Sequence, residues 1–431
     1  MRAAMIVLAV ALAVTTAHAG PALVESKPYR LPPADQLTPR DRFFIKDTQR
    51  YAEVAADATV ELHRIRYRSG KLTVAGFLAR PVPAKGARAK LPVVIWCRGG
   101  YGPDSTVGDG NVETLAELKR LAAAGFVVLM PNYRGHDGGD GVDERGGAEV
   151  EDVKALVKVA RELAGADPAR LFAYGESRGA LDALIAIREG LPVTAVAVTG
   201  PVVDERTRSV NELPPPPGVD WTSAKARERR SPLAWAKELT VPVLILQGST
   251  DRATPPEGAL DLARALEQAG TVYELWIVAG GDHTLTRHRD QRMARLIDWF
   301  QHPRTQSIAV VVEKALDEGG VALARTRFAA ARKAKPGRYH LDEPDLNTLG
   351  YLLLARGRLD DAIAVFELNT QAFPASANVW DSLGEAHAVA GRREVALKHY
   401  RKALAIDPRS ASARAAIARL EATAEQPPPK P

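Results

Sequence analysis

Short apolar segments alternate with amphipathic stretches from Leu91 onward. Apolar runs of this length suit strands that are buried on both faces, and the stretches between them carry apolar residues at helical spacing. The alternation predicts a parallel sheet with crossover helices. The predicted strands are 91–97, 126–130, 170–174, 193–198, 241–246 and 272–278, and the predicted helices are 112–124, 149–163, 178–188, 256–268 and 287–300.

Two more strands are predicted before this alternation, in the N-terminal extension 20–90. Residues 60–68 and 72–80 are separated by Ser69-Gly70, a pair typical of a tight turn. They should form an antiparallel hairpin at an edge of the sheet. Six parallel strands and the hairpin together give an eight-stranded sheet.

The first nineteen residues have the features of an export signal. They contain an apolar run, 3–14, and end in Ala17-His18-Ala19, which satisfies the small-x-small rule of signal peptidase. A membrane anchor is the weaker interpretation, because a spanning helix needs roughly 20 apolar residues. We therefore expect an exported protein, periplasmic or secreted, that is not inserted in a membrane after cleavage.

After residue 302 the pattern becomes helical and repeats itself. A set of small, aromatic and proline positions recurs at a spacing of 34 residues: Leu349, Gly350, Ala362, Phe366 and Pro374 return as Leu383, Gly384, Ala396, Tyr400 and Pro408. The period and the pattern resemble tetratricopeptide (TPR) repeats. The resemblance implies an all-α helical array over 308–424, with a degenerate first repeat at 308–335 and a protein or peptide partner. Residues 425–431 are predicted to be a disordered tail.

Composition excludes some classes of function. The formal charge is +6, from 58 basic and 52 acidic residues spread along the chain, so a nucleic-acid partner is not expected. Cys97 is the only cysteine, so no intramolecular disulfide can form. It ends an apolar strand, which favours a buried thiol over a nucleophile. No zinc or other metal-ligand spacing occurs.

The chemistry centres on Gly175-Glu176-Ser177-Arg178-Gly179, which follows a predicted strand and precedes an alanine-rich helix. A G-x-S-x-G sequence between a strand and a helix is typical of the α/β-hydrolase fold, a doubly wound and mostly parallel α/β architecture. The glycines permit a tight turn that exposes the serine hydroxyl. Ser177 is therefore the predicted nucleophile.

A serine nucleophile needs a histidine to accept its proton and a carboxylate to orient that histidine. In this fold the chain order is serine, acid, histidine. Asp251 follows the strand 241–246 and is the predicted acid, although a turn or helix-cap role is the alternative. His283 follows the last strand and is the predicted base. Asp282 is a second candidate acid, whereas His136 precedes the serine and has the wrong order.

The oxyanion needs backbone donors, which the fold takes from the residue after the nucleophile and from the turn after the third strand. These are Arg178 and the turn Arg98-Gly99-Gly100-Tyr101. Arg98 and Tyr101 are candidate substrate contacts. The guanidinium groups of Arg98 and Arg178 are suited to a substrate carboxylate. The alternative is that they pair with acids of the fold such as Glu176 or Asp152.

At this point a family resemblance is evident. Residues 91–301 resemble the peptidase domain of the prolyl oligopeptidase family, with supporting matches at Pro131-Asn132-Tyr133-Arg134-Gly135, Asp152, Asp167-Pro168-Ala169-Arg170 and Ser231-Pro232. The resemblance implies a serine hydrolase that acts through an acyl-enzyme on peptide or ester bonds and needs no cofactor. Only about sixty mature residues precede the sheet, so the family's β-propeller should be missing.

Several alternatives stay open. The chain could be a carboxylesterase acting on small esters, or a binding protein in which the TPR array carries the function. Within the catalytic domain, 91–302, residues 201–240 form either a cap over the site or a long surface loop. Residues 136–144 are oxygen-rich, but they lack a calcium-loop pattern and are read as an ordinary polar loop.

Overall fold

A computed structural model describes residues 20–45, 47–83, 89–100, 112–206, 218–334 and 339–422. The predicted signal sequence, Tyr101 and the predicted tail lie outside these residues. The chain divides into two compact units. The first unit contains β1 (Leu23–Pro28), η1 (Ala34–Gln36), α1 (Pro39–Phe44), α2 (Thr48–Ala56), β2 (Val60–Ser69), β3 (Leu72–Pro81), β4 (Leu91–Cys97), α3 (Val112–Ala123), β5 (Val127–Pro131) and α4 (Val150–Glu162).

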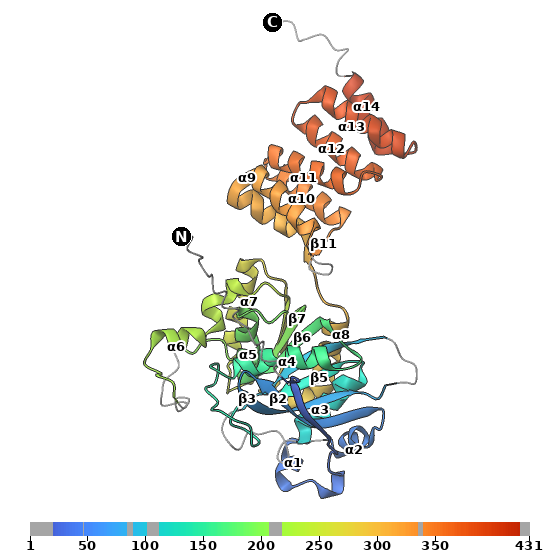
Figure 1. The fold of residues 1–431 in the computed structure, drawn as a ribbon. Helices are drawn as coiled ribbons and strands as arrows, with labels where there is room; N and C mark the ends of the chain where they lie inside the picture. Colours follow the sequence, from blue (N-terminus) through green and yellow to red (C-terminus); the bar gives the residue numbers. More distant parts are fainter. Residues whose placement is uncertain are drawn as a thin grey trace, which may run out of the picture. The chain divides into compact units, whose positions relative to one another are not determined.

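The second unit contains the remaining strands, the helices that follow them and the C-terminal helical array (Figure 1). Its elements up to the array are β6 (Ala166–Glu176), α5 (Arg178–Arg188), β7 (Ala195–Thr199), α6 (Ala224–Arg229), η3 (Pro232–Glu238), β8 (Val243–Gly248), α7 (Pro256–Ala269), β9 (Tyr273–Val278), η4 (Thr286–His288) and α8 (Arg289–Gln301).

The strands follow the order β1-β2-β3-β5-β4-β6-β7-β8-β9 in one sheet. The pairs β4–β5, β6–β7, β7–β8 and β8–β9 are parallel, and the pairs that involve β1, β2 or β3 are antiparallel. This mostly parallel sheet with crossover helices is the α/β-hydrolase fold, as the sequence predicted. The predicted count of eight strands was wrong, because the described sheet has nine.

The extra strand is β1, which pairs with β2 in an antiparallel ladder. Its six residues, Leu-Val-Glu-Ser-Lys-Pro, have no apolar alternation, and only Leu23 and Glu25 are half-buried, so the pattern gave no strand signal. Backbone pairing alone accounts for the strand. The predicted hairpin, β2 and β3, is consequently not at the sheet edge, because β1 pairs with β2 as the outermost strand.

Buried apolar strands form the core of the sheet. Every residue of β5, β7 and β8 is buried, as expected for parallel strands covered on both faces. Helix α5 is buried along its whole length except at Arg188. Cys97 is a free, buried thiol, as predicted, and burial raises its pKa well above the usual value. A raised pKa keeps the thiol protonated and poorly nucleophilic.

The C-terminal array consists of stacked helices (Figure 1). They are α9 (Ile308–Arg332), α10 (Glu343–Ala355), α11 (Leu359–Ala372), α12 (Ala377–Val389), α13 (Arg393–Ile406) and α14 (Ala411–Ala422), with the short strands β10 (Gln306–Ser307) and β11 (Tyr339–His340). Helix α9 is broken at Gly319 and Gly320, which divides it into a helix pair. A Cβ at Gly350 would lie 2.5 Å from the ring of Phe366, and one at Gly384 would lie 3.0 Å from that of Tyr400. The repeated glycines therefore let an aromatic ring pack directly against the backbone of the paired helix.

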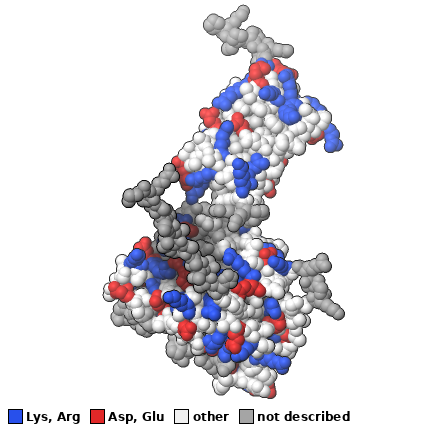
Figure 2. All heavy atoms as spheres, viewed as in Figure 1, with Lys and Arg blue, Asp and Glu red and all other residues white. Residues whose placement is uncertain are grey.

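The segment predicted as a cap or loop is described except for residues 207–217. The described part contains the short helices α6 and η3, and Trp235 donates from its indole nitrogen to the carbonyl of Glu228 at 3.1 Å. Both interpretations of the segment stay open. Among the described residues no helix is long and apolar enough to cross a membrane. Figure 2 shows basic and acidic side chains interspersed on the visible face.

Candidate active site

The turn between β6 and α5 holds Ser177 in a strained conformation. Its φ of 53° and ψ of −119° lie in a region that residues with a side chain rarely adopt. The flanking glycines are required by packing. A Cβ at Gly175 would lie 2.5 Å from the Cα of Ala180, and one at Gly179 would lie 2.0 Å from the carbonyl oxygen of Cys97. The arrangement has the features of a nucleophile elbow.

Asp251 and His283 are joined by a short hydrogen bond. The Nδ1 of His283 lies 2.8 Å from the Oδ2 of Asp251. The carboxylate is fully buried, whereas the imidazole keeps 28% of its side-chain surface exposed. The pair is therefore anchored at the acid and accessible at the histidine, which a proton-transfer group needs.

The environment of Asp251 favours its ionised form. Burial by itself would raise the pKa of this carboxyl, but the hydrogen bond from His283, the amide of Thr254 and the charge of the imidazole outweigh it and lower the pKa to about 2. An ionised carboxylate only accepts hydrogen bonds, so Nδ1 of His283 must donate. In the neutral imidazole the opposite nitrogen, Nε2, is then free to accept a proton.

Both Ser177 and His283 lie at the carboxyl end of β7. The backbone N–H of Ser177 donates to the carbonyl of Thr199 at 2.8 Å. A Cβ on the next residue, Gly200, would lie 3.0 Å from Nδ1 of His283. Gly200 has a φ of 52° and has no side chain, which leaves room for the ring. Two neighbouring residues of one strand end thus contact the serine backbone and the histidine ring.

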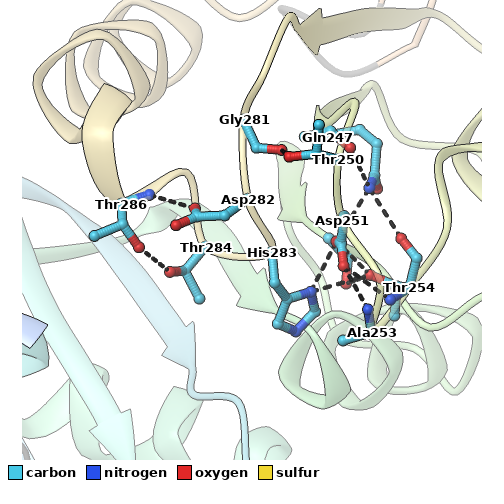
Figure 3. Close-up of polar contacts among 12 residues, drawn as sticks. Gln247, Thr250, Asp251, Ala253, Thr254, Gly281, Asp282, His283, Thr284 and Thr286 are labelled. Carbon is cyan, nitrogen blue, oxygen red and sulfur yellow. Dashed lines mark hydrogen bonds and ion pairs between the residues drawn. The ribbon is translucent and has the colours of Figure 1, made fainter.

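Sequence reasoning missed the residues that hold Asp251 (Figure 3). The Oδ1 of Asp251 accepts from the backbone N–H groups of Ala253 and Thr254 at 2.9 and 3.0 Å. The hydroxyl of Thr254 and the amide of Gln247 lie 2.8 and 3.1 Å from Oδ2. Asp251 is thus a turn aspartate and the partner of His283 at once, so the two predicted roles coexist. The sequence did hold a local signal, because aspartate is common in turns in which its side chain accepts from the backbone N–H groups two and three residues later.

The turn after β4 lies against the elbow. A Cβ at Gly99 would lie 3.3 Å from the Cβ of Ser177 and 3.0 Å from the carbonyl oxygen of Glu176. Gly100 has a φ of 76°, a conformation that favours glycine. Helix α5 begins at Arg178, so its first N–H groups also face the region of the serine. These are the groups that the sequence predicted as oxyanion donors.

Arg98 and Arg178 are buried beside the turn. Their relative exposures are 2% and 5%. Arg98 donates to the carbonyl of Gly99 and Arg178 donates to the carbonyl of Gly100, each at 3.1 Å. Arg178 also forms an ion pair with Asp182 at 3.1 Å. Both guanidinium groups thus contact the backbone of the turn, and a contact with a substrate carboxylate stays a prediction.

Glu176 and its partners connect the elbow to the histidine loop. Arg292, on α8, donates to Oε1 of Glu176 at 2.7 Å and to the carbonyl of Thr284 at 2.8 Å. The hydroxyl of Tyr174 also donates to Oε1, at 2.9 Å. One guanidinium thus bridges the residue before Ser177 and the residue after His283. No pattern in the sequence identifies Arg292, because Glu176 lies 116 residues earlier in the chain.

The other candidate side chains have other partners or fall outside the described residues. Asp282 is exposed, and its Oδ1 accepts from the backbone N–H of Thr286 at 2.6 Å, so its side chain points away from His283 in Figure 3. His136 belongs to the first unit, where its Nε2 lies 2.9 Å from Asp143. Tyr101 is not among the described residues. Within the described ranges, no cluster of three or more His, Cys, Asp or Glu side chains could hold a metal ion.

Comparison with known proteins gives two sequence matches. Residues 113–305 match the prolyl oligopeptidase family, and residues 377–410 match the tetratricopeptide repeat. The uncharacterized peptidase YtmA of Bacillus subtilis (strain 168) is 25% identical over 253 residues, which cover 56% of this chain and 94% of that protein.

Solved structures are similar in fold. Acylaminoacyl peptidase of Pyrococcus horikoshii aligns with a TM-score of 0.48 and 20% identity over 57% of this chain, but over only 42% of the peptidase. The esterase Est22 aligns with a TM-score of 0.48 and 22% identity over 61% of this chain and 85% of the esterase. The match to the acylaminoacyl peptidase thus spans less than half of that chain.

Proposed function

Residues 113–305 are a prolyl oligopeptidase family domain and the chain is a serine hydrolase; from this premise we propose that Ser177, His283 and Asp251 are its catalytic triad. The observation that carries the proposal is the hydrogen bond between His283 and the buried carboxylate of Asp251. It accompanies a serine held at positive φ in a strand-to-helix turn. The three residues also stand in the chain order that this fold uses.

Each group has a definite part in the reaction. The Oγ of Ser177 attacks the substrate carbonyl carbon while its proton moves to Nε2 of His283. Asp251 keeps the proton of Nδ1 in place and stabilises the imidazolium that forms. His283 then protonates the leaving amine or alcohol, and the acyl group stays on Ser177. Water, deprotonated by His283, releases the acid and restores the serine.

The negative charge that develops on the substrate oxygen needs hydrogen-bond donors. The backbone N–H of Arg178, at the start of α5, and that of Gly100, in the turn against Ser177, are the proposed donors. They belong to rigid backbone, so little reorganisation is needed when the charge appears.

The substrate is an acyl compound, either a peptide or an ester. The B. subtilis relative is named a peptidase and Est22 is named an esterase. A peptide is the substrate that we propose, because residues 113–305 match a peptidase family. The tetratricopeptide repeat at 377–410 is of a kind that can mediate protein interaction, and we propose a protein or peptide partner for the array.

The first experiment tests whether Ser177 is activated. Purified protein is treated with a fluorescent fluorophosphonate, alongside Ser177→Ala and a matched Ser249→Ala variant, since Ser249 lies in the turn after β8 and donates no group to the proposed reaction. Circular dichroism and thermal melting establish that each protein is folded. Labelling of the wild type and Ser249→Ala, but not of Ser177→Ala, supports the proposal. A folded wild type that is not labelled contradicts it.

Export is a separate proposal that depends on residues 1–19 alone. Expression of the full chain in a Gram-negative host, followed by mass spectrometry of the purified N-terminus, should find Gly20 as the first residue. A protein that keeps its first nineteen residues would count against cleavage.

A further inference from the structure

Two buried arginines donate hydrogen bonds to the glycine turn that follows β4. Arg98 donates from a terminal nitrogen to the carbonyl of Gly99, and Arg178 does the same to the carbonyl of Gly100. Both side chains are almost completely buried. Consecutive carbonyl groups of a Gly-Gly turn are therefore each held by a guanidinium, and such charge-assisted hydrogen bonds are about twice as strong as neutral ones.

This contact determines where a neighbouring N–H group points. In a planar trans peptide the C=O and the N–H point in opposite directions. The carbonyl of Gly99 shares its peptide unit with the N–H of Gly100. When Arg98 binds that carbonyl, the N–H of Gly100 is directed away from the guanidinium. An ideal Cβ at Gly99 would lie 3.3 Å from the Cβ of Ser177, so the turn that carries this N–H lies next to the predicted nucleophile.

Such a peptide needs an external restraint. Glycine adopts positive and negative φ with similar ease, so a peptide between two glycines can flip at little cost. A flip would replace the N–H with a carbonyl oxygen, which repels the developing oxyanion. A Cβ at Gly99 would lie 3.0 Å from the carbonyl oxygen of Glu176, which is a tight contact, so a stiffer residue there would require the elbow to shift. Side chains outside the peptide can supply the restraint instead.

Arg178 is itself held in place. Its Nε lies 3.1 Å from Oδ2 of Asp182, one helical turn along α5, and the carboxylate is fully buried. The ion pair fixes the guanidinium on the same helix that carries the other proposed donor, the N–H of Arg178. The contact of Arg178 with the carbonyl of Gly100 thereby links the turn to α5.

We propose that Arg98 is a positioning residue that locks the Gly99–Gly100 peptide so that the N–H of Gly100 faces the reacting carbonyl, and that Arg178 steadies the same turn through the next carbonyl, that of Gly100. The inference rests on the proposed triad. In this proposal the two arginines do not bind a substrate carboxylate; they hold the backbone that supplies an oxyanion donor. Neither side chain touches the substrate, so both act through the backbone of the turn.

The test compares an ester with its thionoester, using p-nitrophenyl butyrate and the corresponding thiono compound. Sulfur accepts hydrogen bonds poorly, so an intact donor pair favours the oxygen ester. Arg98→Met should lower kcat for the ester roughly 10- to 100-fold, short of the roughly 10²- to 10³-fold expected when a donor is lost outright, with KM changed less than about threefold. The ratio of ester to thionoester hydrolysis should fall by a similar factor. Arg98→Lys should recover part of both losses.

Arg188→Met is the control, because Arg188 also pairs with an acid, Glu238 at 2.8 Å, but lies at the end of α5 away from the turn. It should leave kcat and the ester ratio unchanged. Should Arg98→Met fail to fold by circular dichroism, Arg178→Met tests the second contact of the turn, and the double change Arg178→Met with Asp182→Leu removes its ion pair as a unit.

The outcomes separate this inference from the proposed function. If the wild type hydrolyses the ester through Ser177 but the folded variants keep the wild-type ester ratio, the positioning role is refuted and the triad stands. Equal losses for both substrates refute it as well, since a general structural defect does not discriminate oxygen from sulfur. If the wild type has no fluorophosphonate-reactive serine, the proposed function fails and the inference fails with it.

Discussion

Replacing the buried acid of the proposed triad, Asp251→Asn, tests the site most directly. The carboxylate accepts from the imidazole of His283, from two backbone N–H groups and from the side chains of Gln247 and Thr254. An asparagine fills the same volume, but its amide nitrogen cannot accept. It also has no charge to stabilise an imidazolium. We expect kcat to fall roughly 10³- to 10⁴-fold, because the imidazole loses the partner that selects its tautomer.

The same change has a calculable effect on stability. The pKa of Asp251 falls from 3.8 to about 2 on folding, and each pKa unit corresponds to about 1.4 kcal/mol, so ionised Asp251 stabilises the fold by about 2 kcal/mol. Because the folded-state pKa is the lower one, this contribution is fully present above pH 3.8 and is lost as the pH falls through about 2. The difference in unfolding free energy between wild type and Asp251→Asn should therefore shrink below about pH 4.

Urea unfolding at several pH values from 7 to 3, followed by circular dichroism, measures that difference, and p-nitrophenyl butyrate hydrolysis measures kcat. Asp282→Asn is the control, since Asp282 is adjacent to His283 in sequence but is exposed and accepts from Thr286. It should keep activity within about twofold. Full activity in folded Asp251→Asn, or a stability difference independent of pH, would refute the reasoning.

Three further changes test the packing around the site and in the helical array. Thr254→Val removes the hydroxyl beside Asp251, the acid of the proposed triad, and keeps the volume; we expect kcat/KM to fall about tenfold with little change in KM, measured by ester hydrolysis. Gly179→Ala would place a Cβ 2.0 Å from the carbonyl oxygen of Cys97, so the free energy of unfolding should drop by about 3 kcal/mol or more in urea titrations, and a loss below about 1 kcal/mol would contradict the geometry. Gly350→Ala would place a Cβ 2.5 Å from the ring of Phe366 and should cost about 1–3 kcal/mol locally, seen as faster amide exchange in α10 and α11 with hydrolysis unchanged.

Prediction from the sequence worked where a feature is local. The apolar runs anticipated β4 at its observed bounds, Leu91–Cys97, and α5 likewise. The elbow could be recognised in the sequence because close contacts at the turn require glycine at 175 and 179. The TPR period could be recognised because each repeated glycine packs against an aromatic residue sixteen positions later, Phe366 in one repeat and Tyr400 in the next.

Prediction failed where an element or a partner depends on distant backbone. Strand β1 is an edge strand with an exposed, polar sequence, and pairing with β2 alone accounts for it. The contact of Arg178 with the carbonyl of Gly100, 78 residues earlier in the chain, had no signal in the sequence either. The bridging position of Arg292 had no signal at all.

The sequence by itself determined the order and type of the main elements, the chemistry available at the turn and the order of serine, acid and histidine along the chain. These follow from periodicity, turn composition and residue type, which are properties of neighbours. Only the tertiary structure decided that Asp251 and His283 share a hydrogen bond and that Thr254 and Gln247 hold the acid. It also decided that Arg98 and Arg178 bind the carbonyl groups of the glycine turn. Those contacts depend on how the strand ends meet in space, because residues that are far apart in the sequence come within hydrogen-bond distance only when the chain is folded.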